Sequence, residues 1–264
     1  MFKIGAIGAG HMGMAVLDAI ATQVNPAEVL VYEIDQHRKK AVKSRSFAAA
    51  GSEYEVYCNS EILLLALRPQ SCEELFNKLV KGTDKREESP VVFNIMSGIS
   101  SNYIRKYLGE ETPVITVIPT LGMKTGQGAA AVAFTDNVPA DILSYILDIF
   151  KRTGEAVVLP ESSLKEIIAV NGCMPGYVFY LIDAFARVAQ GVDYSTASRI
   201  VARGFIGSAL QVMEGGDPKE LMGQVCTKGG LTAQGVDYFE KNQLDKILEE
   251  GMGESIRRGY ELGK

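Results

Sequence analysis

The chain has 264 residues, of which 47% are hydrophobic and 22% charged, a composition typical of globular proteins. This length lies near the size at which one hydrophobic core divides into two domains. The net charge of −5 and the lack of a basic run argue against a nucleic-acid partner. No apolar stretch approaches the roughly 20 residues that a membrane span needs, so we expect no membrane partner.

The cysteines and histidines are few and scattered. Cys58, Cys72, Cys173 and Cys226 show no CxxC spacing, and the only histidines are His11 and His37. This pattern indicates free thiols in a reducing cytoplasm and no metal site. The N-terminus has no signal-peptide pattern, and we expect folded structure to begin there directly.

Strand and helix patterns alternate through residues 1–159. Strands are predicted at residues 2–7, 29–32, 62–67, 91–95, 114–118, 129–134 and 155–159, and helices at residues 11–22, 35–46, 71–80, 100–107 and 141–151. Such alternation predicts a mainly parallel, doubly wound sheet of the Rossmann type.

Residues 160–264 contain only helical patterns, punctuated by Gly and Pro. They are predicted to form a second, all-α domain for substrate binding and dimerisation. Residues 177–189 are apolar on nearly every face, so we expect them to be buried all round within the chain or covered by another subunit. The overall fold class is therefore α/β, followed by helices.

A glycine-rich turn links the first predicted strand to the first predicted helix. Residues 8–13 read GAGHMG, a GxGxxG pattern that gains weight because it follows a strand and opens a helix. Such glycines allow a tight turn, close approach of backbone to a pyrophosphate, and close packing of helix on strand. We predict a dinucleotide-binding loop formed by Gly8, Ala9, Gly10, His11, Met12 and Gly13, with the pyrophosphate at the helix N-terminus.

An acidic residue ends the second predicted strand. Glu33 lies about 20 residues beyond the last glycine, where dinucleotide-binding domains place the carboxylate that binds the adenosine ribose. A carboxylate there repels a 2′-phosphate and favours NADH over NADPH. Arg38, Lys39 and Lys40 follow within a turn or two and keep NADPH open as an alternative.

Histidines are too few for the acid–base chemistry of most alcohol dehydrogenases. His11 lies in the glycine loop and His37 just after the second strand. A protonated C=N bond already accepts hydride and needs mainly orientation and an anchor for its carboxylate. The sequence therefore favours imine reduction.

A second glycine loop lies in the helical half. Residues 217–232 read DPKELMGQVCTKGGLT, and the backbone amides of the glycines before a predicted helix can form an anion-binding nest. This segment resembles the pyrroline-5-carboxylate reductase family, which carries a pattern close to hPxxLxxxVxSPGGTT. By that resemblance Thr232 is the catalytic residue that hydrogen-bonds the substrate's ring nitrogen, and the carboxylate is bound by Thr227, Gly229, Gly230 and Leu231.

Three further motifs carry the same resemblance. Residues 62–70 (ILLLALRPQ) are similar to the family's VFLAVKPQ, residues 95–100 (IMSGIS) to SIxAGIS, and residues 172–179 (GCMPGYVF) to GSGPAYVF. The resemblance implies reduction of a cyclic imino acid, Δ1-pyrroline-5-carboxylate, to L-proline by NADH or NADPH in a homodimer or higher homo-oligomer. It also implies cofactor contacts from Ala66, Leu67, Arg68, Pro69, Ser97 and Gly98.

Three family motifs are altered here, which keeps other functions open. TKGG (227–230) replaces SPGG, GCMPG (172–176) replaces GSGPA, and IPTLG (118–122) replaces MPNTP. Met174 and Lys228 add a long apolar side chain and a cation, so a larger or differently charged substrate is one alternative.

Two other functions fit this two-domain plan. A 3-hydroxyacid dehydrogenase would use a helical Lys and Asn, for which Lys165 and Asn171 are candidates, although their spacing exceeds the roughly three or four residues that share a helix face. A regulatory protein that binds the cofactor without turnover would also keep this fold. NADH oxidation on addition of pyrroline-5-carboxylate separates these hypotheses.

Overall fold

The computed structural model describes residues 1–80 and 89–262 and divides into two compact units. Unit 1 comprises Met1–Cys173 with Ser255–Lys264, and unit 2 comprises Met174–Glu254. The domain boundary expected between residues 159 and 160 stays a prediction. The segment just after it, α7 (Leu164–Val170), packs with the sheet of unit 1.

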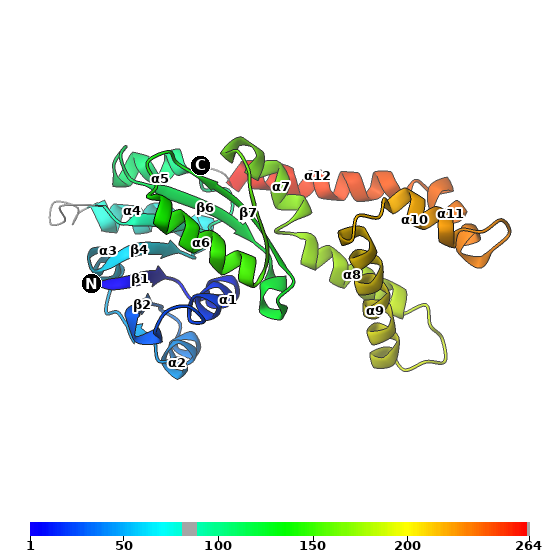
Figure 1. Ribbon diagram of the computed structural model, residues 1–264, viewed down its shortest axis with the longest axis horizontal. Coiled ribbons are helices and arrows are strands. Elements are labelled where there is room, and N and C mark those ends of the chain that lie inside the picture. The colour runs from blue at the N-terminus through cyan, green and yellow to red at the C-terminus, as the bar shows by residue number, and fades with distance from the viewer. Residues whose placement is uncertain (81–88, 263–264) are drawn as a thin grey trace. The chain divides into compact units, whose positions relative to one another are not determined.

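Unit 1 contains an eight-stranded sheet with helices on both faces (Figure 1). The strand order is β3-β2-β1-β4-β5-β6-β7-β8, with every neighbouring pair parallel except β6 and β7. The strands are β1 (Phe2–Ile7), β2 (Val29–Tyr32), β3 (Ala48–Ala49), β4 (Ser60–Leu65), β5 (Val91–Asn94), β6 (Val114–Pro119), β7 (Gly128–Phe134) and β8 (Gly154–Val158). The helices are α1 (His11–Ile20), α2 (Gln36–Ser44), α3 (Glu53–Asn59), α4 (Cys72–Val80), α5 (Ser101–Leu108), α6 (Ala140–Arg152) and α7. The doubly wound α/β fold predicted from the alternating pattern is confirmed.

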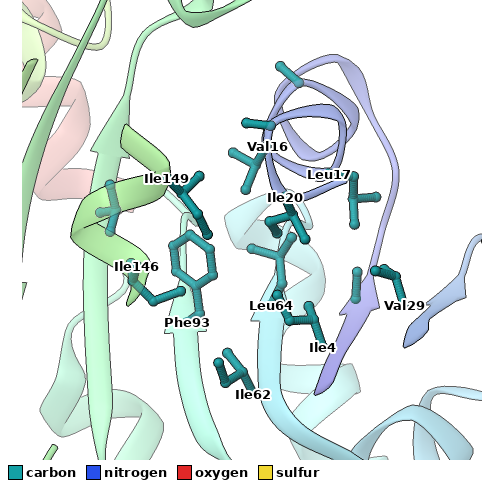
Figure 2. Packing of buried hydrophobic residues seen from close by; sticks show 14 of the residues in the cluster. Ile4, Val16, Leu17, Ile20, Val29, Ile62, Leu64, Phe93, Ile146 and Ile149 are labelled. Carbon is teal, nitrogen blue, oxygen red and sulfur yellow. The ribbon is translucent and has the colours of Figure 1, made fainter. Parts of the chain in front are cut away.

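Both faces of the central strands β4, β5 and β6 are buried, which explains why these strands read as continuous apolar runs. Ile62, Leu63, Leu64 and Leu65 are all fully buried, and alternate residues face opposite cores. On one face, α1 and α6 cover the strands (Figure 2). On the other face, α3, α4 and α5 pack against the sheet.

The sequence pattern does not predict β3 or α3. Both elements are short, with two and seven residues. A local signal for α3 is nevertheless present, because Ser52 begins an S-x-x-E sequence typical of helix starts. Its side chain accepts a hydrogen bond from the N–H of Glu55 at 3.1 Å.

Unit 2 is entirely helical. Its helices are α8 (Met174–Ala186), α9 (Tyr194–Met213), α10 (Pro218–Val225), α11 (Leu231–Lys241) and the first part of α12 (Leu244–Leu262). The rings of Phe185 in α8 and Phe205 in α9 stack with centroids 5.9 Å apart.

The expectation that the chain buries residues 177–189 on all sides is wrong. Within α8 only Ala186 is buried, while Phe179 and Tyr180 are 64% and 70% exposed. The physical reason is that, among the helices of unit 2, α8 packs mainly against α9, which leaves its other apolar faces without cover from this unit. Cover by another subunit is the alternative that the sequence left open.

By length and composition alone, Glu161–Ala186 is apolar enough to cross a membrane. This differs from the expectation that no stretch approaches that length. The first part of the segment is α7, whose Leu164, Ile168 and Ala169 are buried, the first two in a cluster with β6 and β7. Packing on the sheet thus accounts for Leu164 and Ile168, whereas Val170 at the end of α7 is 47% exposed.

Candidate active site

The switch point of the sheet lies at β1, whose neighbours β2 and β4 connect in opposite directions. Ligands of doubly wound sheets bind outside the carboxyl ends of the strands at such a point. The loops that follow β1, β2 and β4 here surround a cavity of about 440 Å³. Its lining residues are Gly8, Gly10, His11, Met12, Gly13, Glu33, Ile34, Arg38, Ala66, Leu67, Arg68, Ser71 and Ile95.

The three loop glycines serve different purposes. Gly8 has φ +94°, and a Cβ on it would lie 2.7 Å from the carbonyl oxygen of Ala66. A Cβ on Gly13 would lie 2.8 Å from the carbonyl oxygen of Gly8, so packing requires glycine at both positions. A Cβ on Gly10 would approach only the Arg38 guanidinium, at 3.8 Å. Glycine at position 10 therefore leaves room on the cavity side, as close approach of a pyrophosphate requires.

Backbone donors complete this anion site. Gly10 is the N-cap of α1 and provides no side-chain cap, and the first N–H groups of a helix have no intrahelical acceptor. The N–H groups of His11, Met12 and Gly13 belong to this first turn. Together with the helix dipole, they form a site suited to a phosphate group. The residues present thus fit a dinucleotide.

Glu33 is held firmly at the carboxyl end of β2. The residue is 6% exposed, and its Oε2 accepts the N–H of Ala9 at 2.8 Å. Its Oε1 accepts the N–H groups of Ile34 and Asp35 at 2.8 and 2.9 Å. The carboxylate therefore fixes the turn after β2 and the glycine loop at the same time.

The start of α2 brings a cation beside this carboxylate. Asp35 caps α2 by accepting the N–H of Arg38 at 2.9 Å, and this hydrogen bond lowers the pKa of Asp35. The guanidinium Nη1 of Arg38 then lies 3.9 Å from Oε2 of Glu33.

Most of the predicted cofactor-binding residues come together at this cavity. Those that line it are Gly8, Gly10, His11, Met12, Gly13, Glu33, Ala66, Leu67 and Arg68. Ala9 is a buried residue of the loop whose N–H donates to Glu33, and Pro69 begins the short helical turn after Arg68. Ile34, Ser71 and Ile95 also line the cavity and were not predicted as site residues. The sequence feature that could have identified them is their position after β2, β4 and β5, at the carboxyl ends of the strands.

Ser97 and Gly98 lie in the loop between β5 and α5. Buried Asn94 holds this loop by donating to the carbonyl of Ile99 and accepting the N–H of Met96, both at 2.9 Å. Gly98 has φ +80° and lines a separate small cavity of about 40 Å³. The roles of Ser97 and Gly98 toward a cofactor stay predictions.

The second glycine loop lies in unit 2 between α10 and α11. Gly229 has φ +74°, and Gly230 is the N-cap of α11. The N–H of Gly230 donates to the carbonyl of Thr227 at 2.8 Å, and a Cβ on Gly230 would lie 2.6 Å from the Thr227 hydroxyl. The loop thus commits the Gly230 amide to its own turn, while Leu231 and Thr232 open the helix.

Lys165 and Asn171 are not brought to a common site. The side-chain amide of buried Asn171 donates to the carbonyl of Ile118 at 2.6 Å. The Lys165 ammonium lies 4.8 Å from the centre of the Tyr260 ring, a cation–π contact. Each side chain therefore has its own structural partner, which weakens the dehydrogenase alternative.

Comparison with protein families matches both halves of the chain. The family described as "Pyrroline-5-carboxylate reductase dimerisation" matches residues 161–262, and the family described as "NADP oxidoreductase coenzyme F420-dependent" matches residues 3–96. The chain is 28% identical to the pyrroline-5-carboxylate reductase of Escherichia coli (strain K12), over 99% of this chain and 98% of that protein. It is 25% identical to that of Aquifex aeolicus, over 98% of this chain and 97% of the relative.

Solved structures show the same fold. A Plasmodium falciparum pyrroline carboxylate reductase, solved with NADP bound, matches with a TM-score of 0.88 and 21% identity, covering 100% of this chain and 98% of that one. A Streptococcus pyogenes 1-pyrroline-5-carboxylate reductase matches with a TM-score of 0.86 and 20% identity, covering 98% of both chains. The motifs, the full-length relatives and the dimerisation family agree: the chain is similar to pyrroline-5-carboxylate reductases over nearly its whole length.

Proposed function

We propose that this chain is an NAD(P)H-dependent oxidoreductase that reduces Δ1-pyrroline-5-carboxylate to L-proline. The observation that carries this proposal is that curated pyrroline-5-carboxylate reductases match nearly the whole chain, cofactor half and helical half alike. We place the reaction in the cytoplasm, where the four free cysteines would stay reduced.

In unit 1, the proposed role of the chain is to hold and orient the cofactor, which when bound supplies hydride to the imine carbon. The pyrophosphate would accept hydrogen bonds from the backbone N–H groups in the first turn of α1, beside Gly10. Ala66, Leu67, Arg68 and Pro69, with Ser97 and Gly98, would continue the contacts toward the nicotinamide. Oε2 of Glu33 accepts one hydrogen bond within the chain, which leaves it able to accept a ribose hydroxyl and favours NADH.

In unit 2, the proposed role of residues 227–232 is to bind the substrate carboxylate and orient the ring. The left-handed Gly229 and the exposed N-terminus of α11 at Leu231 offer backbone N–H groups to an anion. Gly230 contributes by its missing Cβ, since its N–H already has an acceptor, and the Thr227 hydroxyl flanks the loop. Thr232 would hydrogen-bond the ring nitrogen without serving as a strong acid.

The test is turnover by the purified chain. Oxidation of NADH or NADPH on addition of pyrroline-5-carboxylate, with proline identified as the product, is the expected result. Cofactor binding without turnover would favour the regulatory alternative. Oxidation of a 3-hydroxyacid with NAD⁺ in place of imine reduction would favour the dehydrogenase alternative.

We also propose that the chain works as an obligate homodimer or a higher homo-oligomer built on its helical region. Phe179, Tyr180 and Ile200 are 64%, 70% and 65% exposed on α8 and α9, an apolar surface of the kind that subunit interfaces cover. Light scattering at micromolar concentration should give at least twice the mass of 28.6 kDa. A monomeric mass would contradict this proposal.

A further inference from the structure

Arg38 projects from the first turn of α2 into the cofactor cavity. Its guanidinium Nη1 lies 3.9 Å from Oε2 of Glu33 and 3.8 Å from the position that a Cβ on Gly10 would take. The side chain is 48% exposed, so it is free to change rotamer. It therefore lies close to both the glycine loop and the carboxylate proposed to bind the ribose.

Glu33 itself has little freedom. Three backbone N–H groups, from Ala9, Ile34 and Asp35, hold its two oxygens, and its side chain is 4% exposed. A carboxylate oxygen accepts about two hydrogen bonds, so Oε1 is satisfied and Oε2 can accept one more. A ribose 2′-hydroxyl can take that position. A 2′-phosphate cannot donate there, and it needs a cation instead.

The sequence contains three cationic residues that could bind a 2′-phosphate, and the structure shows which of them lines the cavity. Arg38, Lys39 and Lys40 are consecutive on α2 and all are exposed. Among the residues described around the 440 Å³ cavity, Arg38 is the one of the three that takes part in its lining. A planar guanidinium also binds phosphate through two parallel hydrogen bonds, which an ammonium cannot do.

We propose that Arg38 binds the 2′-phosphate of NADPH and thereby lets this site use NADPH as well as NADH. With NADH, the ribose hydroxyl donates to Oε2 of Glu33. With NADPH, the Arg38 guanidinium turns to the 2′-phosphate and offsets its repulsion by Glu33, while the backbone donors keep Glu33 in place. This inference rests on the proposed function for the use of a nicotinamide cofactor.

The test is equilibrium binding of nucleotide fragments, measured by calorimetry on the full chain. The probes are 2′,5′-ADP, which carries the 2′-phosphate, and 5′-AMP, which lacks it. Arg38→Ala should weaken 2′,5′-ADP binding roughly 10- to 100-fold, the loss expected for hydrogen bonds to a charged group, and leave 5′-AMP within about twofold. Arg38→Lys should restore part of the loss. Lys40→Ala, which removes the same charge from the same helix, is the matched control and should change both affinities within about twofold.

The outcomes separate this inference from the proposed function because fragment binding requires no imine. Unchanged 2′,5′-ADP binding by Arg38→Ala, or an equal loss in Lys40→Ala, would overturn the role of Arg38 even where the parent reduces pyrroline-5-carboxylate with NADPH. A parent that binds neither fragment would overturn the cofactor site itself. Selective loss in Arg38→Ala supports the inference whatever the imine substrate proves to be.

Discussion

The carboxylate of Glu33 accepts the backbone N–H of Ala9 at 2.8 Å, across a separation of 24 residues in the sequence. This hydrogen bond joins the carboxyl end of β2 to the glycine loop that follows β1. Ala9 is 2% exposed and Glu33 6%, so water has little access to the bond. Glu33 therefore shapes the loop in addition to its proposed contact with the ribose.

Glu33→Ala is expected to change both stability and cofactor preference. The buried N–H of Ala9 loses its acceptor, which should lower the free energy of unfolding by about 1 to 3 kcal/mol. Urea denaturation measures this change. Affinity for NADH should fall more than affinity for NADPH, because only NADH offers a 2′-hydroxyl to the carboxylate. Glu61→Ala, which removes a partly exposed carboxylate paired with Lys3, is the control. An unchanged ratio of the two affinities would contradict the ribose assignment.

The sequence predicted the α/β fold of the first half well because local patterns determine it. Each of the patterns used is complete within a few consecutive residues. They are the GxGxxG of residues 8–13, apolar runs such as Ile62–Leu65 and the acidic residue after β2. The contacts that complete the site are long-range. The bond from Glu33 to Ala9 and the approach of Arg38 to Gly10 depend on how α2 packs, which no local pattern specifies.

The helical half was less predictable for a physical reason. An apolar helix such as α8 has the same sequence pattern whether its own chain or a second copy covers it. Phe179 and Tyr180 are exposed in the single chain, so periodicity alone predicted their burial wrongly. Likewise, the pair Gly229-Gly230 suggested two available amides, whereas the fold turns the Gly230 N–H toward Thr227.

Two glycine substitutions should fail in different ways. Gly13→Ala places a Cβ 2.8 Å from the Gly8 carbonyl oxygen, so it should lower the free energy of unfolding as well as cofactor affinity. The Cβ added by Gly10→Ala would lie near only the Arg38 guanidinium, at 3.8 Å, so the fold should keep its stability. The same Cβ should obstruct binding of the pyrophosphate. Urea unfolding and NADH titration of both variants check this. Full NADH affinity in Gly10→Ala would argue against a pyrophosphate at this loop.

Tyr145 in α6 predicts a loss of stability at alkaline pH. Its hydroxyl is buried with no hydrogen-bond partner in the described part of the chain, and burial raises the pKa of Tyr145 to about 12. An unfolded tyrosine titrates at about 10, so the unfolded chain releases this proton first as the pH rises. The stability that comes from keeping Tyr145 protonated is therefore fully present below about pH 10, and it is lost as the pH rises through about 12.

Tyr145→Phe should remove this titration. Its free energy of unfolding should fall less than that of the parent between about pH 10 and 12, because phenylalanine has no proton to release. At neutral pH the variant should equal or exceed the parent, since an unpartnered buried hydroxyl is lost. Tyr238→Phe, at a 66% exposed position outside the apolar surface of α8 and α9, serves as the control. Identical alkaline curves for the parent and Tyr145→Phe would refute the assignment.

Thr232→Ala tests the proposed catalytic role of the second glycine loop. A hydrogen bond to the ring nitrogen in a desolvated site contributes about 2 to 4 kcal/mol to transition-state stabilisation, which corresponds to roughly 30- to 1000-fold in rate. We expect kcat/KM for pyrroline-5-carboxylate to fall by that factor while NADH affinity is unchanged. Thr232 lies in unit 2, whereas the glycine loop of residues 8–13 lies in unit 1. Stability should hardly change, since Thr232 is exposed.

The matched control is Thr196→Ala, the same chemical change in the first turn of α9, which should leave kcat/KM at the parental value. Reduction by Thr232→Ala at the parental rate would show that the hydroxyl does not orient the imine. A loss of kcat/KM in Thr232→Ala together with weaker NADH binding would instead indicate a general change in structure. No reduction by the parent itself would mean that the replacement of SPGG by Thr227-Lys228-Gly229-Gly230 has changed the substrate, and larger or differently charged imino acids would be assayed next.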